Sequence, residues 1–255
     1  MKIFFQNIIL LYSMLIISCS SSASSSELSI QELFQSGLSN LEKEKYLKAQ
    51  ADFTKVILRG SGSDLGDDAL YYLAESYYRN EEYLEAIGEY EKLTRRMGFS
   101  PFTEDARFKI CEAYSIESPK YFHDQDYTER ALERYQEFLD DYPDSKYVES
   151  ALESIKDLRE KMGLKLYESG ILYMKMEEYD SAEMMFKRVL EYYYDTNIVN
   201  DAKQGIVLAL ANSRRIDDAI LYLNENENSL KEFNLYNDAK NKINTIQDKL
   251  EKEKN

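Results

Sequence analysis

The chain has 255 residues, of which 44% are apolar and 31% are charged, and its formal net charge is −15. Its 9 glycines and 3 prolines are too few for an all-β fold, which needs many turns. Affinity for nucleic acid comes chiefly from Lys and Arg side chains that neutralise phosphates, so a chain this acidic is not expected to bind nucleic acid. For the same reason, charge alone is not expected to attach it to an anionic membrane.

The first residues have the pattern of a bacterial secretion signal. Lys2 precedes a largely apolar run that is shorter than the ~20 residues a membrane-spanning helix needs. The segment Leu15-Ile16-Ile17-Ser18-Cys19 resembles a lipobox, in which the signal is cut just before a cysteine that carries lipid. We therefore predict a signal peptide over 1–18, lipidation of Cys19, and a flexible serine-rich tether over 19–29. An ordinary signal peptide with an incidental cysteine is the alternative.

From Ile30 onward the sequence repeats a small residue followed four positions later by a large one. Four copies end in an aromatic and a weaker fifth ends in leucine: Ala49–Phe53, Ala86–Tyr90, Ala131–Tyr135, Ala182–Phe186 and Ala219–Leu223. This spacing is typical of the second helix of a tetratricopeptide repeat (TPR), where the small residue lets two helices approach and the large one fills the gap. The sequence predicts an all-α fold, a TPR superhelical solenoid of about five helix pairs.

The predicted TPR array covers 30–230, and its helix pairs are unevenly spaced. Their ranges are near 30–60, 67–98, 104–143, 163–196 and 200–228. Extra length in the third pair falls around 116–126, which we expect to be a loop between its two helices. Apolar residues continue at helical spacing through 145–175, which predicts one long helix or two nearly continuous ones. A C-terminal capping helix and tail are predicted over 231–255.

In such a stack the first helix of each pair lines a concave groove. In the predicted register the first three pairs place aromatic, apolar and charged side chains there: Phe34, Leu38, Tyr71, Glu75, Tyr78, Arg79, Phe108 and Glu112. Rings can bury the apolar side chains of an extended peptide, and polar groups can satisfy its backbone. The alternative is that several of these rings pack between neighbouring helices.

No arrangement of residues indicates catalysis, a metal site or a cofactor. A Ser/His/Asp triad would depend on His123, the single histidine, which falls in the expected loop. The carboxylates alternate with Lys and Arg along predicted helix faces, which indicates a solvated surface. Cys111 lies on the predicted packed face of a helix, where we expect a buried thiol. We therefore expect a protein that binds other proteins and is not an enzyme.

The central part of the chain resembles a known family. Asp124-Gln125-Asp126-Tyr127-Thr128, then Ala131 and Phe138, then Tyr142-Pro143-Asp144-Ser145-Lys146-Tyr147 follow the order found in the outer-membrane assembly lipoproteins of the BamD (YfiO, ComL) family. Further matching elements lie downstream: Leu158-Arg159, Glu168, Tyr179, Ala182 and Asp195-Thr196. With the lipobox and the repeats, the resemblance covers nearly the whole chain, and no single binding residue is carried over from it.

The resemblance implies a lipid-anchored, periplasm-facing protein of the outer membrane, within the machinery that folds β-barrels into that membrane. Its C-terminal repeats would contact the barrel-type core subunit, alongside sister lipoproteins, and its N-terminal repeats would touch unfolded outer-membrane clients. Ser20 favours the outer membrane by similarity to enterobacterial lipoproteins. The alternative function is a periplasmic TPR lipoprotein that coordinates cell-wall or division proteins. An enzyme carried on a TPR scaffold is a third possibility, disfavoured because no spare domain is present.

Overall fold

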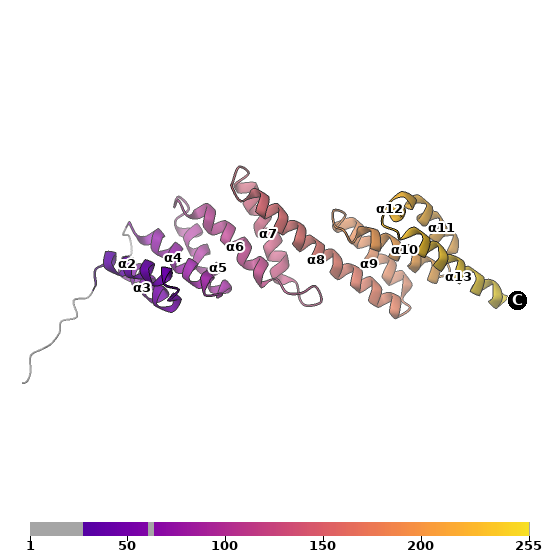
Figure 1. The fold of residues 1–255 in the computed structure, drawn as a ribbon, viewed down its shortest axis with the longest axis horizontal. Coiled ribbons are helices and arrows are strands. Elements are labelled where there is room, and N and C mark those ends of the chain that lie inside the picture. Colours follow the sequence, from indigo (N-terminus) through magenta and orange to yellow (C-terminus); the bar gives the residue numbers. More distant parts are fainter. Residues whose placement is uncertain (1–27, 61–63, 255) are drawn as a thin grey trace, which may run out of the picture.

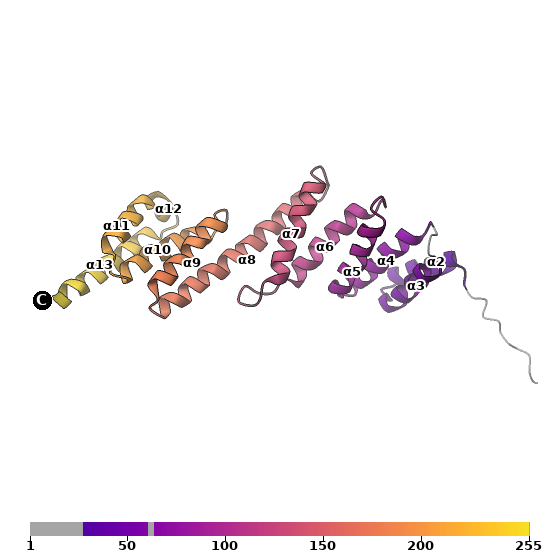
Figure 2. The ribbon, with the colours of Figure 1, turned by 180° about the vertical axis from the view of Figure 1, so that it is seen from behind.

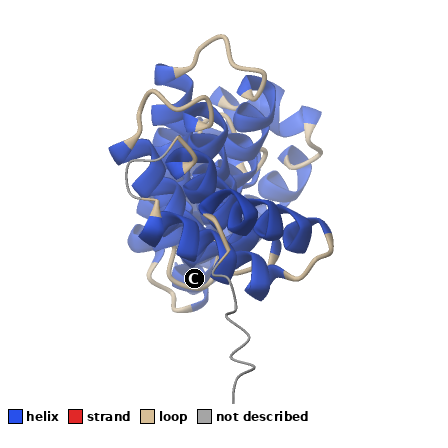
Figure 3. Ribbon diagram, turned by 90° about the vertical axis from the view of Figure 1, so that its left-hand side faces the viewer, coloured by secondary structure: helices blue, strands red, loops and turns tan. Residues whose placement is uncertain are grey.

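The structure is a computed structural model that describes residues 28–60 and 64–254. These residues form twelve α-helices and no strand. Figure 3 views them along the long axis and shows only helices and loops in the described part of the chain. The predicted signal peptide over 1–18, Cys19 and most of the tether over 19–29 lie outside the described residues. None of the described helices is both long and apolar enough to cross a membrane.

The helices stack one after another along an elongated molecule, from α2 at one end to α13 at the other (Figures 1 and 2). The predicted all-α fold of about five TPR helix pairs is confirmed. The elements of the five pairs are α2 (Ile30–Glu42) with α3 (Tyr46–Arg59), α4 (Gly66–Arg79) with α5 (Tyr83–Arg96), α6 (Thr103–Glu117) with α7 (Asp126–Asp141), the second half of α8 (Val148–Lys175) with α9 (Tyr179–Tyr192), and α10 (Val199–Asn212) with α11 (Ile216–Glu225).

Close contact between the two helices of a pair depends on the small and large residues of the repeat. The five alanines of the repeated pattern are 0% exposed, and each partner side chain is at most 3% exposed. In the first pair, a Cβ added to Gly37 would lie 2.7 Å from the ring of Phe53; in the fourth, one added to Gly170 would lie 2.5 Å from the ring of Phe186. The small and large residues of the repeat therefore mark the positions where the backbone of one helix packs against a large side chain of the other.

In four of the five pairs (the first, second, fourth and fifth), the turn between the two helices has the same backbone conformation. Glu44, Glu81, Glu177 and Arg214 each take a positive φ between 55° and 66°. The residue that follows donates a backbone hydrogen bond to a carbonyl five positions earlier, as from Glu82 to Tyr77 at 3.0 Å. Helices commonly end with a glycine in the left-handed conformation and a backbone hydrogen bond back to the last turn. Here charged residues take the place of that glycine.

The loop that joins one pair to the next is held by a serine and an aromatic residue. After α7, Ser145 donates to Glu104 at 2.6 Å, and Tyr147 stacks on Phe108 with ring centroids 4.1 Å apart and donates to Asp105 at 2.8 Å. After α5, Ser100 and Phe102 repeat this arrangement on Asp67 and Tyr71. The Tyr-Pro-Asp-Ser-Lys-Tyr segment, residues 142–147, therefore fixes the loop after α7 against α6, and we call this segment the clasp.

One helix, α8, joins two blocks of the solenoid. It is 28 residues long, which resolves the two expectations for 145–175 in favour of a single helix. Its first half packs on α7 and ends the core that runs from Leu70 to Leu158, whereas its second half pairs with α9 and contributes to the core that runs on to Ile243. In Figure 1 it crosses obliquely between the two blocks. The first pair has a smaller core of its own around Phe34 and Phe53.

The range 231–255, expected to be a C-terminal capping helix and tail, holds the end of one short helix and most of a longer one. The chain forms a short α12 (Glu227–Glu232) and a separate α13 (Tyr236–Lys254). Asn234 lies between them with φ 61°, a left-handed conformation that asparagine adopts more readily than most residues. The break turns α13 back onto α10 and α11, where Ala239 and Ile243 are buried.

Candidate functional site

Five of the predicted groove residues come together on the first helices of the second and third pairs. We call this group, with two neighbours from α5 and α6, the Tyr–Glu cluster; its members are Tyr71, Glu75, Tyr78, Arg79, Tyr90, Lys109 and Glu112. At its centre the buried carboxylate of Glu75 accepts a hydrogen bond from the hydroxyl of Tyr90 and two from Arg79, at 3.2 Å from Nε and 3.1 Å from Nη2.

These contacts explain why a carboxylate can be buried on this face. A buried charge is tolerated when it is paired and its lone pairs are hydrogen-bonded. The same contacts hold the guanidinium of Arg79 in place, while 51% of that side chain remains exposed. Arg79 therefore presents oriented donors at the surface.

The second part of the cluster is a charged edge beside a tyrosine ring. Lys109 donates to Glu112 at 2.7 Å and lies 4.5 Å from the centre of the Tyr78 ring, while the Tyr78 hydroxyl is 3.5 Å from the same carboxylate. Burial, followed by the charge of Glu112, raises the pKa of Tyr78 well above its ordinary value. A flat ring with fixed donors and acceptors around it can bind a polypeptide.

Tyr71 is half-buried, and Phe102 from the loop after α5 covers its ring. Its ring stacks on Phe102 with centroids 4.4 Å apart and is 6.0 Å from the ring of Tyr90. Burial is the main cause that raises its pKa, with the nearby carboxylate of Glu75 adding to the effect. Tyr71 thus supports the cluster from beneath more than it faces solvent.

The other predicted groove residues lie elsewhere. Phe34 is buried against Phe53 and Tyr72 in the core of the first pair, with Leu38 half-buried beside it. Phe108 is buried beneath Tyr147. These two rings pack between neighbouring elements, as the alternative expectation allowed, and offer little surface to a ligand.

Sequence reasoning missed Tyr90 and Lys109. Tyr90 occupies the large position of the repeat, where Phe53 and Phe186 stand in two other pairs. A hydroxyl at a fully buried position requires a partner, and Glu75 was the acceptor available on the facing helix. That replacement of phenylalanine by tyrosine was the available signal. Nothing in the sequence marked Lys109 apart from other lysines.

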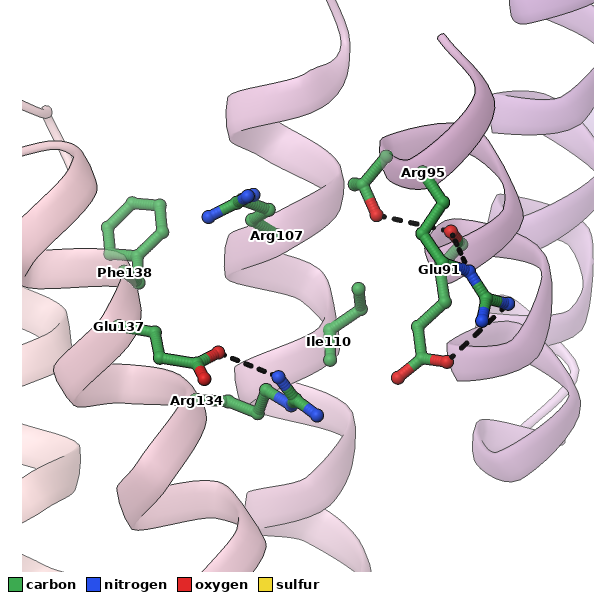
Figure 4. A pocket seen from close by; sticks show the side chains of 8 residues that line it. Glu91, Arg95, Arg107, Ile110, Arg134, Glu137 and Phe138 are labelled. Atoms are coloured by element: carbon green, nitrogen blue, oxygen red, sulfur yellow. Dashed lines mark hydrogen bonds and ion pairs between the residues drawn. The ribbon is translucent and has the colours of Figure 1, made fainter. Parts of the chain in front are cut away.

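A pocket of about 300 Å³ opens between α5, α6 and α7, on the side of the second helices (Figure 4). Ile110 of α6 lines it between charged side chains of α5 and α7. Arg134 donates to Glu137 at 2.7 Å, Arg95 lies 3.9 Å from Glu91, and Arg107 pairs with Asp141. The Nε atom of Arg134 is buried without a hydrogen-bond partner. Each guanidinium already has its carboxylate, so the charges in this pocket are balanced.

The loop expected around 116–126 lies between α6 and α7, at 118–125, and is tied to its surroundings through buried polar groups. Gln125 donates to the carbonyls of Lys120 and His123, and Thr128 donates to Gln125 at 2.7 Å. His123 itself is exposed, and among the described residues no group of three His, Cys, Asp or Glu side chains could hold a metal ion. Cys111 is 1% exposed, as predicted for a buried thiol, and its burial raises its pKa to about 12.

Solved structures similar to this chain include several TPR proteins. A TPR protein from Parabacteroides merdae is 17% identical, with 86% of this chain and 74% of that chain covered and a TM-score of 0.38. The TPR2AB domain of yeast Sti1, solved in complex with pHSP90, is 14% identical, with 88% and 84% covered and a TM-score of 0.45. A thermophilic TPR protein from Thermus thermophilus is 17% identical, with 86% and 99% covered and a TM-score of 0.35.

No curated protein matches the chain. The family model described as YfiO, outer membrane lipoprotein, matches residues 26–218. This match covers the first four helix pairs, the clasp, the long α8 and, in the fifth pair, α10 and the first turn of α11. The chain therefore belongs to the YfiO family of outer membrane lipoproteins.

Proposed function

We propose that the chain is a non-catalytic scaffold lipoprotein of the outer-membrane β-barrel assembly and insertion machinery. The observation that carries this proposal is the match of the YfiO family over residues 26–218. A stack of TPR helix pairs is an extended surface suited to protein partners. The partners proposed are the β-barrel core subunit and sister lipoproteins of that machinery.

We also propose that unfolded outer-membrane clients bind at the Tyr–Glu cluster. An extended peptide can lay an apolar side chain against the Tyr78 ring, while Arg79 and Lys109 donate to its backbone carbonyls. Phe34 and Phe108 contribute little to this contact because their rings are covered. The client surface is therefore narrower than the groove expected from the sequence.

The proposed location is the outer membrane, facing the periplasm, with the protein held by lipid on Cys19. Support for the anchor comes from the lipobox and from the family, since Cys19 is outside the described residues. Labelling with radioactive palmitate tests it directly: the native chain should incorporate label, and Cys19→Ala should not. Incorporation into the Cys19→Ala chain would show that lipid is attached elsewhere.

A detergent pull-down from native membranes, with a tag at the C-terminus and mass spectrometry of the recovered proteins, tests the scaffold role. We expect a β-barrel core subunit with periplasmic repeat domains, and depletion of the chain should lower the level of barrel proteins. Recovery of wall-synthesis or division proteins with unchanged barrel proteins would favour the alternative, a TPR lipoprotein of cell-wall or division processes. Crosslinking of client peptides to Tyr78→Ala and Arg79→Ala chains tests the cluster separately.

A further inference from the structure

The outward face of α3, the second helix of the first pair, carries an uncharged stripe. Its four positions are three or four residues apart, so they share one helix face, and all four are exposed: Leu47, Ala51, Thr54 and Leu58. Leu47 is 69% exposed and Leu58 is 75% exposed. At about 1.5 Å of rise per residue, the stripe is about 17 Å long. We call these four residues the α3 stripe.

Among the five second helices that the structure describes, only α3 has such a face. Counted from the alanine of the repeat, the same four positions hold at least two charged side chains on α5, α7 and α9, and the first of them is Asp217 on α11. On α7 they are Glu129, Glu133, Gln136 and Asp140. The uncharged face is therefore particular to the first pair and is not a requirement of the repeat.

A line of basic side chains follows one edge of the α3 stripe. Each of them comes directly after a stripe residue, and all three are exposed: Lys48, Lys55 and Arg59. The one acidic residue of α3, Asp52, faces α2, where it accepts hydrogen bonds from Ser36 at 2.7 Å and Asn40 at 2.9 Å. Its carboxylate is 3.9 Å from Lys55. The edge of the stripe therefore presents an excess of positive charge.

The other second helices lack this excess. Basic and acidic residues number three and three on α5, two and six on α7, two and three on α9, and none and three on α11. The turn before α3 adds two residues of each sign and so leaves the balance of α3 unchanged. Over the first pair, residues 28–60, five basic residues stand against four acidic ones, whereas the whole chain has 32 against 47. An apolar helix face edged with Lys and Arg is typical of a helix that lies on an anionic lipid surface.

The chain enters the described structure at the end of α3 where the stripe ends. Arg59, the last residue of α3, donates from Nη1 to the backbone carbonyl of Leu28 at 2.9 Å. Leu28 is itself 46% exposed. Together α2 and α3 form one end of the elongated molecule (Figure 1). The preceding part of the chain is therefore attached beside the stripe, at the extremity of the solenoid.

The proposed lipid anchor keeps this end of the molecule close to a membrane. Cys19, the proposed site of lipid attachment, is nine residues before Leu28. A segment of nine residues spans at most about 32 Å even when fully extended. The end of α3 therefore stays within that distance of the anchored residue, and the surface always available to the α3 stripe is the membrane itself.

We propose that the α3 stripe lies on the anionic phospholipid surface of the membrane that holds the anchor. Leu47 and Leu58 enter the headgroup region, and Lys48 and Lys55 contact lipid phosphates. Charge acts here together with apolar contact and a lipid chain, and not alone. The inference rests on the proposed anchor and goes beyond it, because the anchor limits only distance whereas this contact fixes which face of the first pair meets the bilayer.

Fluorescence quenching in vesicles of defined composition tests the proposal. The lipoprotein, purified from native membranes with its lipid, is reconstituted into vesicles of phosphatidylethanolamine and phosphatidylglycerol that contain a lipid spin-labelled at its headgroup. An NBD probe is attached at Ala51→Cys. The matched control is Leu221→Cys, which has the same position in the repeat on α11 and is 59% exposed. Cys111 is 1% exposed and Cys19 carries the lipid, so the introduced thiol is the one that reacts.

We expect blue-shifted emission at position 51 and quenching at least about threefold stronger there than at position 221. In vesicles of phosphatidylcholine, the difference between the two positions should fall at least about twofold, because the lysines then lack an anionic lipid. Equal quenching at the two positions would overturn the proposal. A difference that is undiminished in phosphatidylcholine would overturn the assignment of an anionic surface.

Charge substitutions test the lysines separately from the net charge of the chain. Lys48→Glu with Lys55→Glu should lower quenching at position 51 at least about twofold, and more at low salt than at high salt. Lys249→Glu with Lys252→Glu on α13 makes the same change in net charge and should leave the quenching unchanged. All four side chains are exposed, so thermal melting by circular dichroism should be the same for both chains. Equal losses of quenching in the two chains would contradict the role given to the α3 lysines.

The anchor and the α3 contact fail in different ways. A purified chain that does not float with the vesicles would overturn the anchor and, with it, this inference. A chain that floats with the vesicles yet shows equal quenching at positions 51 and 221 would leave the anchor standing and overturn the inference alone. Recovery of cell-wall proteins in the pull-down would overturn the proposed role in β-barrel assembly, while stronger quenching at position 51 would still support the contact of α3 with lipid.

Discussion

At the scale of single residues, glycines in this solenoid have opposite roles depending on what faces them. A Cβ added to Gly170 would lie 2.5 Å from the Phe186 ring, whereas one added to Gly88 would meet nothing within 4 Å. We expect Gly170→Ala to lower the free energy of unfolding by about 1–3 kcal/mol, because the ring cannot move from a full core. Gly88→Ala should raise it by about 0.5–1 kcal/mol. Urea unfolding followed by circular dichroism measures both, and a gain in stability for Gly170→Ala would contradict the packing described.

The buried bond between Tyr90 and Glu75 gives a second prediction. Tyr90→Phe removes the hydroxyl and leaves a buried carboxylate with Arg79 as its remaining partner. Hydrogen bonds to charged groups contribute about 1.5–3 kcal/mol, so the free energy of unfolding should fall by that amount. Tyr127→Phe is the control, because the half-buried Tyr127 hydroxyl makes no hydrogen bond within the described structure, and it should change stability by less than about 0.5 kcal/mol. Equal effects of the two changes would show that the Glu75 contact adds nothing.

Tyr135 provides a test by pH. It is 1% exposed, and burial is the main cause that raises its pKa from the ordinary 10.0 to about 12. The folded chain therefore keeps this proton where the unfolded chain loses it, so the stabilisation is complete below pH 10 and declines as pH rises toward 12. Between about pH 9.5 and 11.5, the native chain should lose about 1–2 kcal/mol more stability than Tyr135→Phe. Chemical unfolding of both chains at each pH measures this difference, and parallel pH profiles would contradict it.

At the scale of elements, the turns inside the pairs store a small strain. Glu81 has φ 62°, a left-handed conformation that costs a side chain such as glutamate about 1–2 kcal/mol and asparagine less. Glu81→Asn should therefore raise the free energy of unfolding by about 0.5 kcal/mol or more. Asn234→Glu, at the equivalent conformation before α13, should lower it by a similar amount. Thermal melts of the two variants should shift in opposite directions, and shifts of the same sign would show that strain at the turn is not the cause.

The elements also show what could be predicted from sequence and what could not. The second helices were predictable because alanine followed four positions later by a large residue places both on one helical face, the face that packs on the other helix of the pair. The break in the cap was not, since no glycine or proline marks it, and Asn234 alone supplies the turn. At Gly163 the sequence left two readings open. The helix continues there because Ile198, Thr196 and Tyr193 pack against the open side of the glycine, and such tertiary contacts override local preference.

The candidate surface was predictable by position but not by exposure. Glu75, Tyr78 and Arg79 lie together because the repeat places them on one face of α4. Phe108 lies on α6 where Tyr71 lies on α4, and Tyr147 covers it as Phe102 covers Tyr71, because the loop after each second helix folds back over the first helix. That cover depends on the conformation of an irregular segment joining two pairs, which helical periodicity does not encode.

At the scale of the whole molecule, the continuous α8 makes the solenoid two blocks joined by one helix. One core ends at Leu158 and the next includes Leu166, and apart from the helix α8 itself the junction between them is held largely by polar contacts. These are the ion pair of Arg159 with Asp195 at 2.7 Å and the hydrogen bonds that Lys161 and Lys165 donate to the loop after α6. In repeat proteins, stability is a sum of local terms and nearest-neighbour interfaces. A weak interface in the middle should therefore let one block open while the other stays folded.

Ile206→Ala tests this division, because Ile206 is 0% exposed in the C-terminal core and its truncation should cost about 2–5 kcal/mol. Native-state hydrogen exchange should show faster exchange from α9 to α13 by a factor that matches this loss, with α2 to α7 unchanged. Val56→Ala in the first pair, also 0% exposed, is the reciprocal variant and should leave α9 to α13 protected. Equal acceleration in both blocks would mean that α8 transmits the loss and that the chain unfolds as one cooperative unit.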